Sequence, residues 1–311
     1  MRCVLHIGAD KTGTSSIQWT LAANAAAIAA RNFHYLAAGR QFDRRLRHRS
    51  LGFHFAMRAL DRPARDLQAT LGFTDDDSRR RYRQQFARDF DREVAGLPDE
   101  ATVVISDEAL FVYSEPATAA NAAAFLKPRF AETEIIVYLR RPDLYLASRY
   151  SQHVKMGGRM TLAEYAAANA HKRLYFNRLK NWSDAFGRPH LIIRPFDRAV
   201  LAGGDVVVDL LGQIGLDSSG LDIVRSNVSL TPLGCAIKRR INLLYKRRPP
   251  PHIVRATVNR LFSGGGVRIP PALVGRVHAA WRADHQLVIE HFMAGEEDRL
   301  YRLDDMLDGE D

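Results

Sequence analysis

Residues 1–16 read MRCVLHIGADKTGTSS. The apolar run at residues 4–7 predicts a short buried strand, and a helical pattern runs from residue 17 to residue 30. Between them, Gly8 and Gly13 bracket a tight loop that contains Lys11. Such an arrangement forms a cradle for a phosphate group, because loop N–H groups and the positive end of the helix dipole both favour an anion there. The alternative is an ordinary glycine-containing turn between a strand and a helix, since short glycine motifs have many false matches.

The position of the lysine distinguishes this loop from that of nucleotide triphosphatases. Their motif, G-x-x-x-x-G-K-[ST], places the lysine directly after the second glycine. Here Thr14 occupies that position and Lys11 comes earlier. The run KTGTSS at residues 11–16 instead resembles the 5′-phosphosulfate loop of the sulfotransferases that use 3′-phosphoadenosine 5′-phosphosulfate (PAPS). The resemblance implies that Lys11 reaches the bridging oxygen between the phosphate and the sulfate.

The size and composition of the chain allow a sizeable core and favour anionic ligands. Its 311 residues suit one α/β domain with insertions or two small domains, and its hydrophobic content of 46% is ordinary. The formal net charge of +10 favours nucleotides, sulfated or acidic glycans, nucleic acids or anionic lipids, without choosing among them. Solubility together with an arginine-rich genome would explain the same charge.

The cysteine usage and the hydropathy predict a soluble, cytoplasmic protein. Cys3 and Cys235 are the two cysteines, and they do not make a disulfide framework, so we expect a reducing compartment. Residues 1–16 do not have the pattern of a secretory signal. No run approaches the roughly 20 apolar residues that span a bilayer. The sequence gives no indication of the oligomeric state.

Strands that alternate with helices predict a central parallel sheet. Strands are expected at 4–7, 102–105, 134–139 and 190–193, with residues 31–47 irregular. The expected fold is therefore α/β in three layers, with helices on both faces of the sheet and a P-loop-like phosphosulfate loop. Ligands then gather at the carboxyl ends of the strands, where loops 8–16, 106–109 and 140–148 begin. Helices are expected at 48–60, 75–97, 117–125, 142–155, 162–170, 175–186, 206–214, 233–245 and 272–291.

The predicted domain organisation is a core followed by a helical C-terminal part. Residues 1–245 are expected to form the α/β core. Pro249–Pro251 cannot continue a helix, so the chain breaks after residue 245. Residues 246–311 are expected to be a helical extension or lid packed on the same domain.

A second motif follows the strand at 134–139. Sulfotransferases carry an arginine at a strand end and a serine eight positions later on the next helix, and both contact the 3′-phosphate of PAPS. Arg140 and Ser148 have that spacing, with Pro142 at the family's proline position. A guanidinium forks onto phosphate oxygens, and a hydroxyl in the following helix reaches the same group. The alternative is a surface arginine and an incidental helix serine.

Weaker similarities to bacterial members of the family extend along the chain to about residue 245. Residues 194–197, RPFD, resemble their fourth-strand exit, and residues 226–230, SNVSL, with Arg239 and Asn242, resemble their Asn-x-Ser-Leu segment. The chain departs from the family near the C-terminus. Many animal cytosolic members hold the 3′-phosphate with an Arg-Lys-Gly stretch, for which only 246–247 and 266–268 are candidates here.

The resemblance implies transfer of a sulfuryl group from PAPS to an acceptor hydroxyl or amine, with no metal. Such a step depends on in-line positioning and charge stabilisation. Lys11 would offset charge on the leaving phosphate oxygen, and Thr14 and Ser15 with the loop amides would hold the 5′-phosphate. The residues expected to bind PAPS are Lys11, Thr12, Gly13, Thr14, Ser15, Ser16, Arg140 and Ser148.

A general base should accept the acceptor's proton. Glu108 is the first candidate, because it follows the second expected strand, where several family members place a catalytic His or Glu. His48 is the second, because some members use a residue after the first helix. Pairing with an arginine or helix capping would also explain Glu108. His6 lies within the first strand and is expected to be a hydrogen-bonded core residue.

Two other functions remain possible at this level. One is a nucleotide-dependent kinase on a related P-loop scaffold, which would need Mg²⁺. The other is a non-enzymatic protein that binds nucleic acid or another polyanion, although the sequence contains no recognised nucleic-acid module. For a sulfotransferase, a glycan or glycolipid acceptor is expected from the positive charge and the bacterial resemblance, and no nucleic-acid partner is expected.

Overall fold

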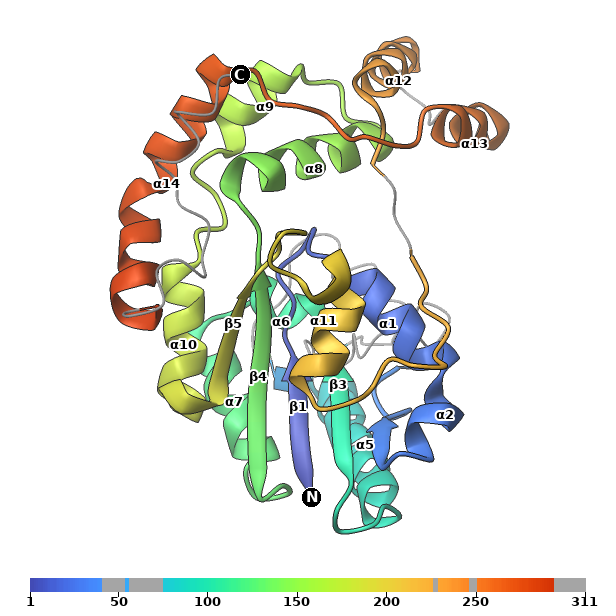
Figure 1. Ribbon diagram of the computed structural model, residues 1–311, viewed down its shortest axis with the longest axis vertical. Helices are drawn as coiled ribbons and strands as arrows, with labels where there is room; N and C mark the ends of the chain where they lie inside the picture. Colours follow the sequence, from blue (N-terminus) through green and yellow to red (C-terminus); the bar gives the residue numbers. More distant parts are fainter. Residues whose placement is uncertain (41–53, 56–74, 226–228, 246–250, 294–311) are drawn as a thin grey trace.

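The computed structural model describes residues 1–40, 54–55, 75–225, 229–245 and 251–293, apart from the side chain of residue 255. Its centre is one sheet of five parallel strands in the order β2-β3-β1-β4-β5 (Figure 1). The strands are β1 (Arg2–His6), β2 (Phe33–Tyr35), β3 (Thr102–Ser106), β4 (Glu132–Leu139) and β5 (Leu191–Pro195). The predicted α/β fold with a parallel sheet is confirmed.

The expectation that residues 31–47 are irregular was wrong at one point. Phe33–Tyr35 forms β2, which pairs with β3 at the edge of the sheet. Three residues are too few to show an alternating apolar pattern, so the register with β3 decides that they are a strand.

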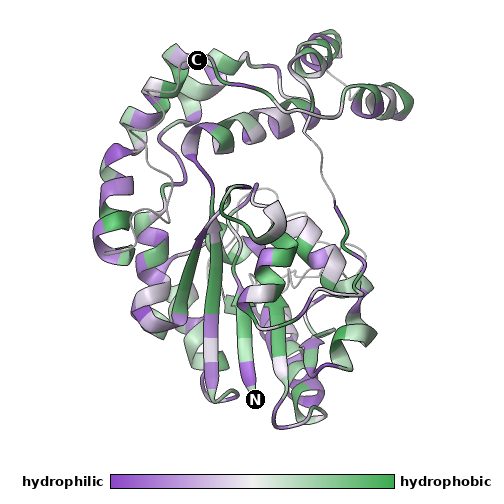
Figure 2. Ribbon diagram, in the orientation of Figure 1, coloured by the Kyte–Doolittle hydropathy of each residue, from purple (hydrophilic) through white to green (hydrophobic). Residues whose placement is uncertain are grey.

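The sheet separates the core into two layers, and β1, between β3 and β4, contributes side chains to both. Cys3, Leu5 and Ile7 belong to one buried cluster, whereas Val4 belongs to the other. This separation follows from the period of two in a strand, which sends successive side chains to opposite faces of the sheet. Figure 2 shows the strands as largely hydrophobic, as expected for a sheet that is covered on both faces.

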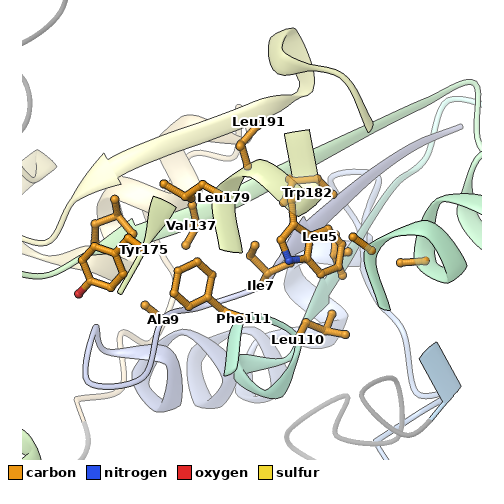
Figure 3. Packing of buried hydrophobic residues seen from close by; sticks show 14 of the residues in the cluster. Leu5, Ile7, Ala9, Leu110, Phe111, Val137, Tyr175, Leu179, Trp182 and Leu191 are labelled. Atoms are coloured by element: carbon orange, nitrogen blue, oxygen red, sulfur yellow. The ribbon is translucent and has the colours of Figure 1, made fainter. Parts of the chain in front are cut away.

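The larger cluster joins the sheet to helices that are far apart in the sequence. In Figure 3, Ile7, directly after β1, and Val137 of β4 pack with Leu179 and Trp182 of α10 (Phe176–Phe186) and with Phe111 of α6 (Glu108–Val112). The other face is covered by α1 (Thr14–Ala23) and α11 (Val206–Gln213), through residues such as Leu21 and Leu210. The three predicted layers are therefore present.

Most of the predicted helices are confirmed within one to two residues. Their capping residues explain where several begin: Asp75 and Thr161 form capping boxes with Ser78 and Glu164. The helix predicted at 17–30 is divided into α1 and α2 (Ala25–Ala29), and α6 and α13 (His252–Leu261) were not predicted. The predicted helix at 48–60 lies almost entirely outside the described residues. The confirmed helices are α5 (Asp76–Ala95), α7 (Pro116–Leu126), α8 (Pro142–Lys155), α9 (Leu162–Asn169), α10, α11, α12 (Pro232–Leu244) and α14 (Pro271–Phe292).

A layer of helices lies beyond the carboxyl ends of the strands. Figure 1 shows α8 crossing above the sheet, with α14 near its start and α12 near its end. Trp281 and Val288 of α14 belong to the larger buried cluster, and Asp284 accepts hydrogen bonds from the backbone N–H groups of Tyr175 and Phe176 at 2.8 and 3.0 Å. The boundary at residues 245 and 246 stays a prediction.

Two features are absent from the residues given above. None of their helices is long and apolar enough to cross a membrane. They also contain no group of three or more His, Cys, Asp or Glu side chains placed to hold a metal ion. Cys3 and Cys235 are both buried as free thiols.

Candidate functional site

Three loops come together at the carboxyl ends of β1, β3 and β4, as the sequence predicts. The backbone N–H of Asp107 donates to the carbonyl of His6 at 3.0 Å, which joins the ends of β1 and β3. A guanidinium N–H of Arg140, directly after β4, donates to the carbonyl of Lys11 at 2.7 Å. The two motifs, 129 positions apart in the sequence, are therefore in direct contact.

The backbone of the 8–13 loop requires its glycines. Gly8 and Gly13 have φ values of 46° and 77°, in the left-handed region that favours glycine. A Cβ on Gly13 would lie 2.6 Å from Cγ1 of Val206, and one on Gly8 would lie 2.9 Å from Oγ1 of Thr14. Side chains are thus excluded from both positions by backbone conformation and by space.

Lys11 itself has a left-handed backbone, with φ of 71°. A left-handed conformation is uncommon in a residue with a long side chain and persists only where the surroundings hold it. Arg140 holds the Lys11 carbonyl, and the Oγ1 groups of Thr12 and Thr14 donate to the carbonyl of Ala9 at 2.5 and 3.5 Å. The loop is therefore fixed on both sides of Lys11.

The loop leaves a row of backbone donors unused. The helix α1 begins at Thr14, and its first N–H groups have no intrahelical acceptor. Among the residues that the structure describes, no backbone carbonyl accepts from the N–H groups of residues 10–15, whereas Ser16 donates to Gly13 at 2.8 Å. Unpaired N–H groups at a helix N-terminus are the chemistry of an anion site.

The ammonium group of Lys11 lies between acidic and basic side chains. It donates to Oε1 of Gln152 on α8 at 3.0 Å. Burial lowers the pKa of Lys11, and the charges of Asp10 and Glu108 act in the opposite direction. The charges of Arg149 and Arg140 lower that pKa further. Glu108, the first residue of α6, is therefore within electrostatic reach of Lys11, as its position after β3 predicts.

Arg140 is held by contacts that leave part of its fork unused. Besides the Lys11 carbonyl, its guanidinium lies over the ring of Phe196, 5.2 Å from the centroid. Its own carbonyl accepts a hydrogen bond from the hydroxyl of Tyr175 at 2.9 Å. No atom of the described residues accepts a hydrogen bond from the buried Nε of Arg140. Ser148 lies on α8 and is 8% exposed, and no hydrogen bond joins it to Arg140 in the described part of the chain.

His48 and residues 194–197 were also singled out by the sequence. His48 lies outside the described residues. Residues 194–197 make structural contacts: Arg194 pairs with Asp209 at 2.5 Å, and Asp209 also accepts from the hydroxyl of Tyr138 at 2.8 Å. This arrangement fixes α11 against the end of the sheet and places Phe196 under Arg140.

Sequence reasoning missed a cluster around Asp10, the residue before Lys11. Asp10 pairs with Arg149 at 2.9 Å and Arg173 at 3.8 Å, and it accepts a hydrogen bond from the Tyr145 hydroxyl at 3.1 Å. Tyr145, Arg149 and Gln152 follow one another at helical spacing on α8. That spacing was the available signal, but only the fold shows that this side of α8 faces the loop.

His6 is a core residue, as expected. Its Nδ1 lies 2.8 Å from Oγ of Ser106, and burial lowers the pKa of His6 from 6.5 to about 3. Since the folded protein keeps this imidazole neutral while the unfolded chain protonates below about pH 6.5, stability is complete above that pH and falls on acidification. We expect His6 to contribute a loss of up to about 1.4 kcal/mol per pH unit between pH 6.5 and pH 3.

Urea denaturation at pH 7.0 and pH 5.5 would measure this loss. The variant His6→Asn, which keeps a polar side chain near Ser106, should show a shallower dependence on pH. An equal dependence in both proteins would contradict the assignment of the acid sensitivity to His6.

No family model matches the chain. An uncharacterized protein of Archaeoglobus fulgidus is 33% identical over 112 residues, and the matched segment covers 35% of this chain and 30% of that protein. The match thus spans about a third of the relative's length.

Solved structures resemble the chain over nearly its whole length. A sulfotransferase from Alicyclobacillus acidocaldarius matches with a TM-score of 0.51 and 16% identity, covering 93% of this chain and 95% of that one. The sulfotransferase domain of the Synechococcus PCC 7002 olefin synthase matches with a TM-score of 0.42 and 13% identity, covering 94% of each chain. A third, the sulfotransferase domain from the curacin biosynthetic pathway, has a TM-score of 0.37 at 10% identity, covering 84% of this chain and 96% of that one. The first match has the highest TM-score of the three. At 16% identity it shows the fold alone: the chain has a sulfotransferase-type fold.

Proposed function

We propose that the protein is a sulfotransferase that moves a sulfuryl group from PAPS to a hydroxyl or amine of an acceptor. The observation that carries the proposal is the contact between the two motifs, in which Arg140 donates to the carbonyl of Lys11. A phosphosulfate loop and a 3′-phosphate arginine must lie side by side to grip the two ends of one nucleotide. The sulfotransferase-type fold supports the same function.

The residues present fit a PAPS molecule. The space beside Gly13 admits no Cβ. Among the described residues, no backbone carbonyl accepts from the six successive N–H groups of residues 10–15, and the buried Nε of Arg140 has no hydrogen-bond partner. These are donors suited to anionic oxygens. The loop N–H groups, with Thr14 and Ser15, would hold the 5′-phosphate, while Arg140 and Ser148 would hold the 3′-phosphate. PAPS, when bound, supplies an activated sulfuryl group with a phosphate leaving group.

Lys11 would stabilise the charge that grows on the leaving phosphate oxygen. Its ammonium lies near Asp10 and Glu108, whose charges favour the protonated form that this role requires. The hydrogen bond to Gln152 holds the ammonium beside α8. Because the loop backbone is fixed by Arg140 and by the threonine hydroxyls, little rearrangement is needed as charge develops.

Glu108 is the proposed general base. It begins α6 directly after β3, and its charge acts on Lys11, so it lies near the position of the transferred group. We expect Glu108→Gln to lower kcat by about 10²- to 10⁴-fold, the usual range for a positioned acid or base, with PAPS binding unchanged. Initial rates with saturating PAPS measure the first effect, and calorimetry with adenosine 3′,5′-bisphosphate measures the second. Glu132→Gln, at the exposed start of β4, is the matched control and should keep the full rate.

The acceptor is proposed to be a glycan or glycolipid hydroxyl, on the basis of the net charge of +10. Incubation with ³⁵S-labelled PAPS and a panel of glycans, glycolipids and phenols tests the function and the acceptor together. Label transfer supports the function, and its distribution identifies the acceptor class. Failure to bind adenosine 3′,5′-bisphosphate, combined with Mg²⁺-dependent hydrolysis of ATP, would overturn the proposal in favour of a kinase-like activity.

A further inference from the structure

Large exposed apolar side chains gather at one corner of the described structure. Leu244, Met156 and Ile253 are 82, 80 and 73% exposed, and Leu261 and Leu233 are 69 and 60% exposed. They belong to α12, to α13 and to the turn after α8. Large apolar side chains that gather at the surface of a globular protein are a common sign of a binding surface.

These segments are held together by hydrogen bonds. The N–H of Thr231, at the start of α12, donates to the carbonyl of Phe262, just after α13, at 2.8 Å. The side-chain amide of Asn242 donates to the carbonyls of Val154 and Gly158, both at 2.8 Å, and so fixes α12 beside the turn that carries Met156. Figure 1 shows α12 and α13 at the end of α8, away from the sheet.

Each helix presents one exposed side with both apolar and basic residues. Leu233, Arg240 and Leu244 are exposed at spacings of seven and four on α12, which places them on one side of that helix. On α13, Arg260 and Leu261 are exposed seven and eight positions after Ile253, which also places the three on one side of the helix. These six residues, with Met156, are called the α12–α13 surface. Figure 2 shows the same mixture of hydrophobic and hydrophilic residues on both helices.

The excess positive charge lies in the stretch of sequence that contains α12, α13 and the first part of α14. Residues 223–283 contain 12 of the 45 lysines and arginines and no aspartate or glutamate. The other 250 residues contain 33 basic and 35 acidic side chains, so they are close to neutral. The net charge of +10 therefore comes from the segment that includes α12 and α13.

We propose that the α12–α13 surface docks on an anionic lipid bilayer. Exposed leucines and isoleucine beside arginines are the composition of helices that lie in a membrane interface, where apolar side chains enter the acyl boundary and arginines meet anionic headgroups. A polyanion in water would be bound by the arginines alone and would leave the leucines unexplained. The surface stands independently of the proposed function, because no residue of the PAPS site takes part in it.

Docking there would bring the candidate site close to lipid headgroups. The helix α8 starts beside Arg140 and ends beside Met156, and its 14 residues span roughly 20 Å. An acceptor whose lipid part stays in the bilayer and whose polar part extends from it would be presented at this distance. The inference would then favour a lipid-linked acceptor for the same protein.

Vesicle co-sedimentation of the whole chain tests the proposal. One set of vesicles contains phosphatidylcholine alone. The other contains phosphatidylcholine with phosphatidylglycerol as about a third of the lipid. Wild-type protein should sediment with the anionic vesicles, should stay in solution with the neutral ones, and should dissociate as salt rises. Arg240→Gln with Arg260→Gln should weaken binding by about 25-fold, at about fivefold per arginine. Leu244→Ser with Ile253→Ser should weaken it at least tenfold, because both apolar anchors are lost.

Matched controls separate the surface from general charge and hydrophobicity. Arg80→Gln with Arg92→Gln removes two exposed arginines of α5. Val200→Ser removes an apolar side chain that is 43% exposed and lies outside the α12–α13 surface. Both control proteins should bind vesicles like wild type. Equal sedimentation with both vesicle types, or unchanged binding by the leucine–isoleucine variant, would overturn the proposal. So would a wild-type dimer in light scattering that this variant converts to monomer, since a second copy would then be the occupant. Adenosine 3′,5′-bisphosphate binding, measured in parallel, should be unchanged in every variant.

Discussion

Replacing Lys11 with methionine is expected to lower sulfuryl transfer by about 10³-fold or more while the protein remains folded. Removing a single preorganised donor to a developing charge costs about 10²–10³ in kcat, and Lys11 supplies a full positive charge. Methionine keeps an unbranched side chain of similar length, so the left-handed backbone at this position faces no new β-branched clash. The rate is measured with labelled PAPS, and folding by circular dichroism and thermal denaturation.

The matched control is Lys180→Met. Lys180 lies on the surface of α10, where it pairs with Asp184 at 2.5 Å, and its loss should leave the rate unchanged. If Lys11→Met retained more than about a tenth of the wild-type rate, Lys11 would have no part in the chemical step. Loss of thermal stability in Lys11→Met alone would show instead that the loop needs this lysine to fold.

Replacing Arg140 with lysine is expected to lower kcat/KM for PAPS by about 10- to 150-fold, although the charge is kept. The range follows from the roughly 1.5–3 kcal/mol that a charge-assisted hydrogen bond contributes. A guanidinium can donate to the Lys11 carbonyl and to a phosphate at the same time, whereas an ammonium does not have this planar fork. The loss therefore has two parts, one from phosphate binding and one from the position of Lys11.

Adenosine 5′-phosphosulfate, which lacks the 3′-phosphate, separates the two parts. With this donor only the effect on Lys11 remains, so the loss in Arg140→Lys should be smaller than with PAPS but still measurable. The control Arg141→Lys changes the neighbouring arginine, whose guanidinium pairs with Asp143 at 2.8 Å, and should stay within about twofold of wild type. Wild-type kinetics of Arg140→Lys with both donors would contradict the assignment.

The sequence was a good guide to the sheet and to its helices because their patterns are long or well punctuated. The 20-residue helix α5 begins at an aspartate cap and carries Phe86 and Phe90 at helical spacing, so both its type and its start were predictable. By contrast, β2 has three residues and α6 has five. Elements of that length have no period to detect, and their neighbours in the fold decide what they become.

The candidate site divides in a similar way. The loop at residues 8–16 is local, so its glycines and lysine could be recognised from their spacing alone, and Arg140 with Ser148 has a fixed separation on one strand–helix unit. Asp10, Arg149, Arg173 and Gln152 have no such motif. Their partners come from other loops and from α8, and only three-dimensional packing brings them together.

The sequence by itself determined a parallel α/β fold and the two short segments that we assign to PAPS, because strand, turn and helix signals lie within a few residues of one another. Only the tertiary structure decided that Arg140 donates to the Lys11 carbonyl and that Gln152 accepts a hydrogen bond from the Lys11 ammonium. It also decided that exposed leucines and arginines share the surface of α12 and α13. The physical reason is that side-chain contacts across 129 or more positions depend on how strands pair and helices pack, which no local pattern contains.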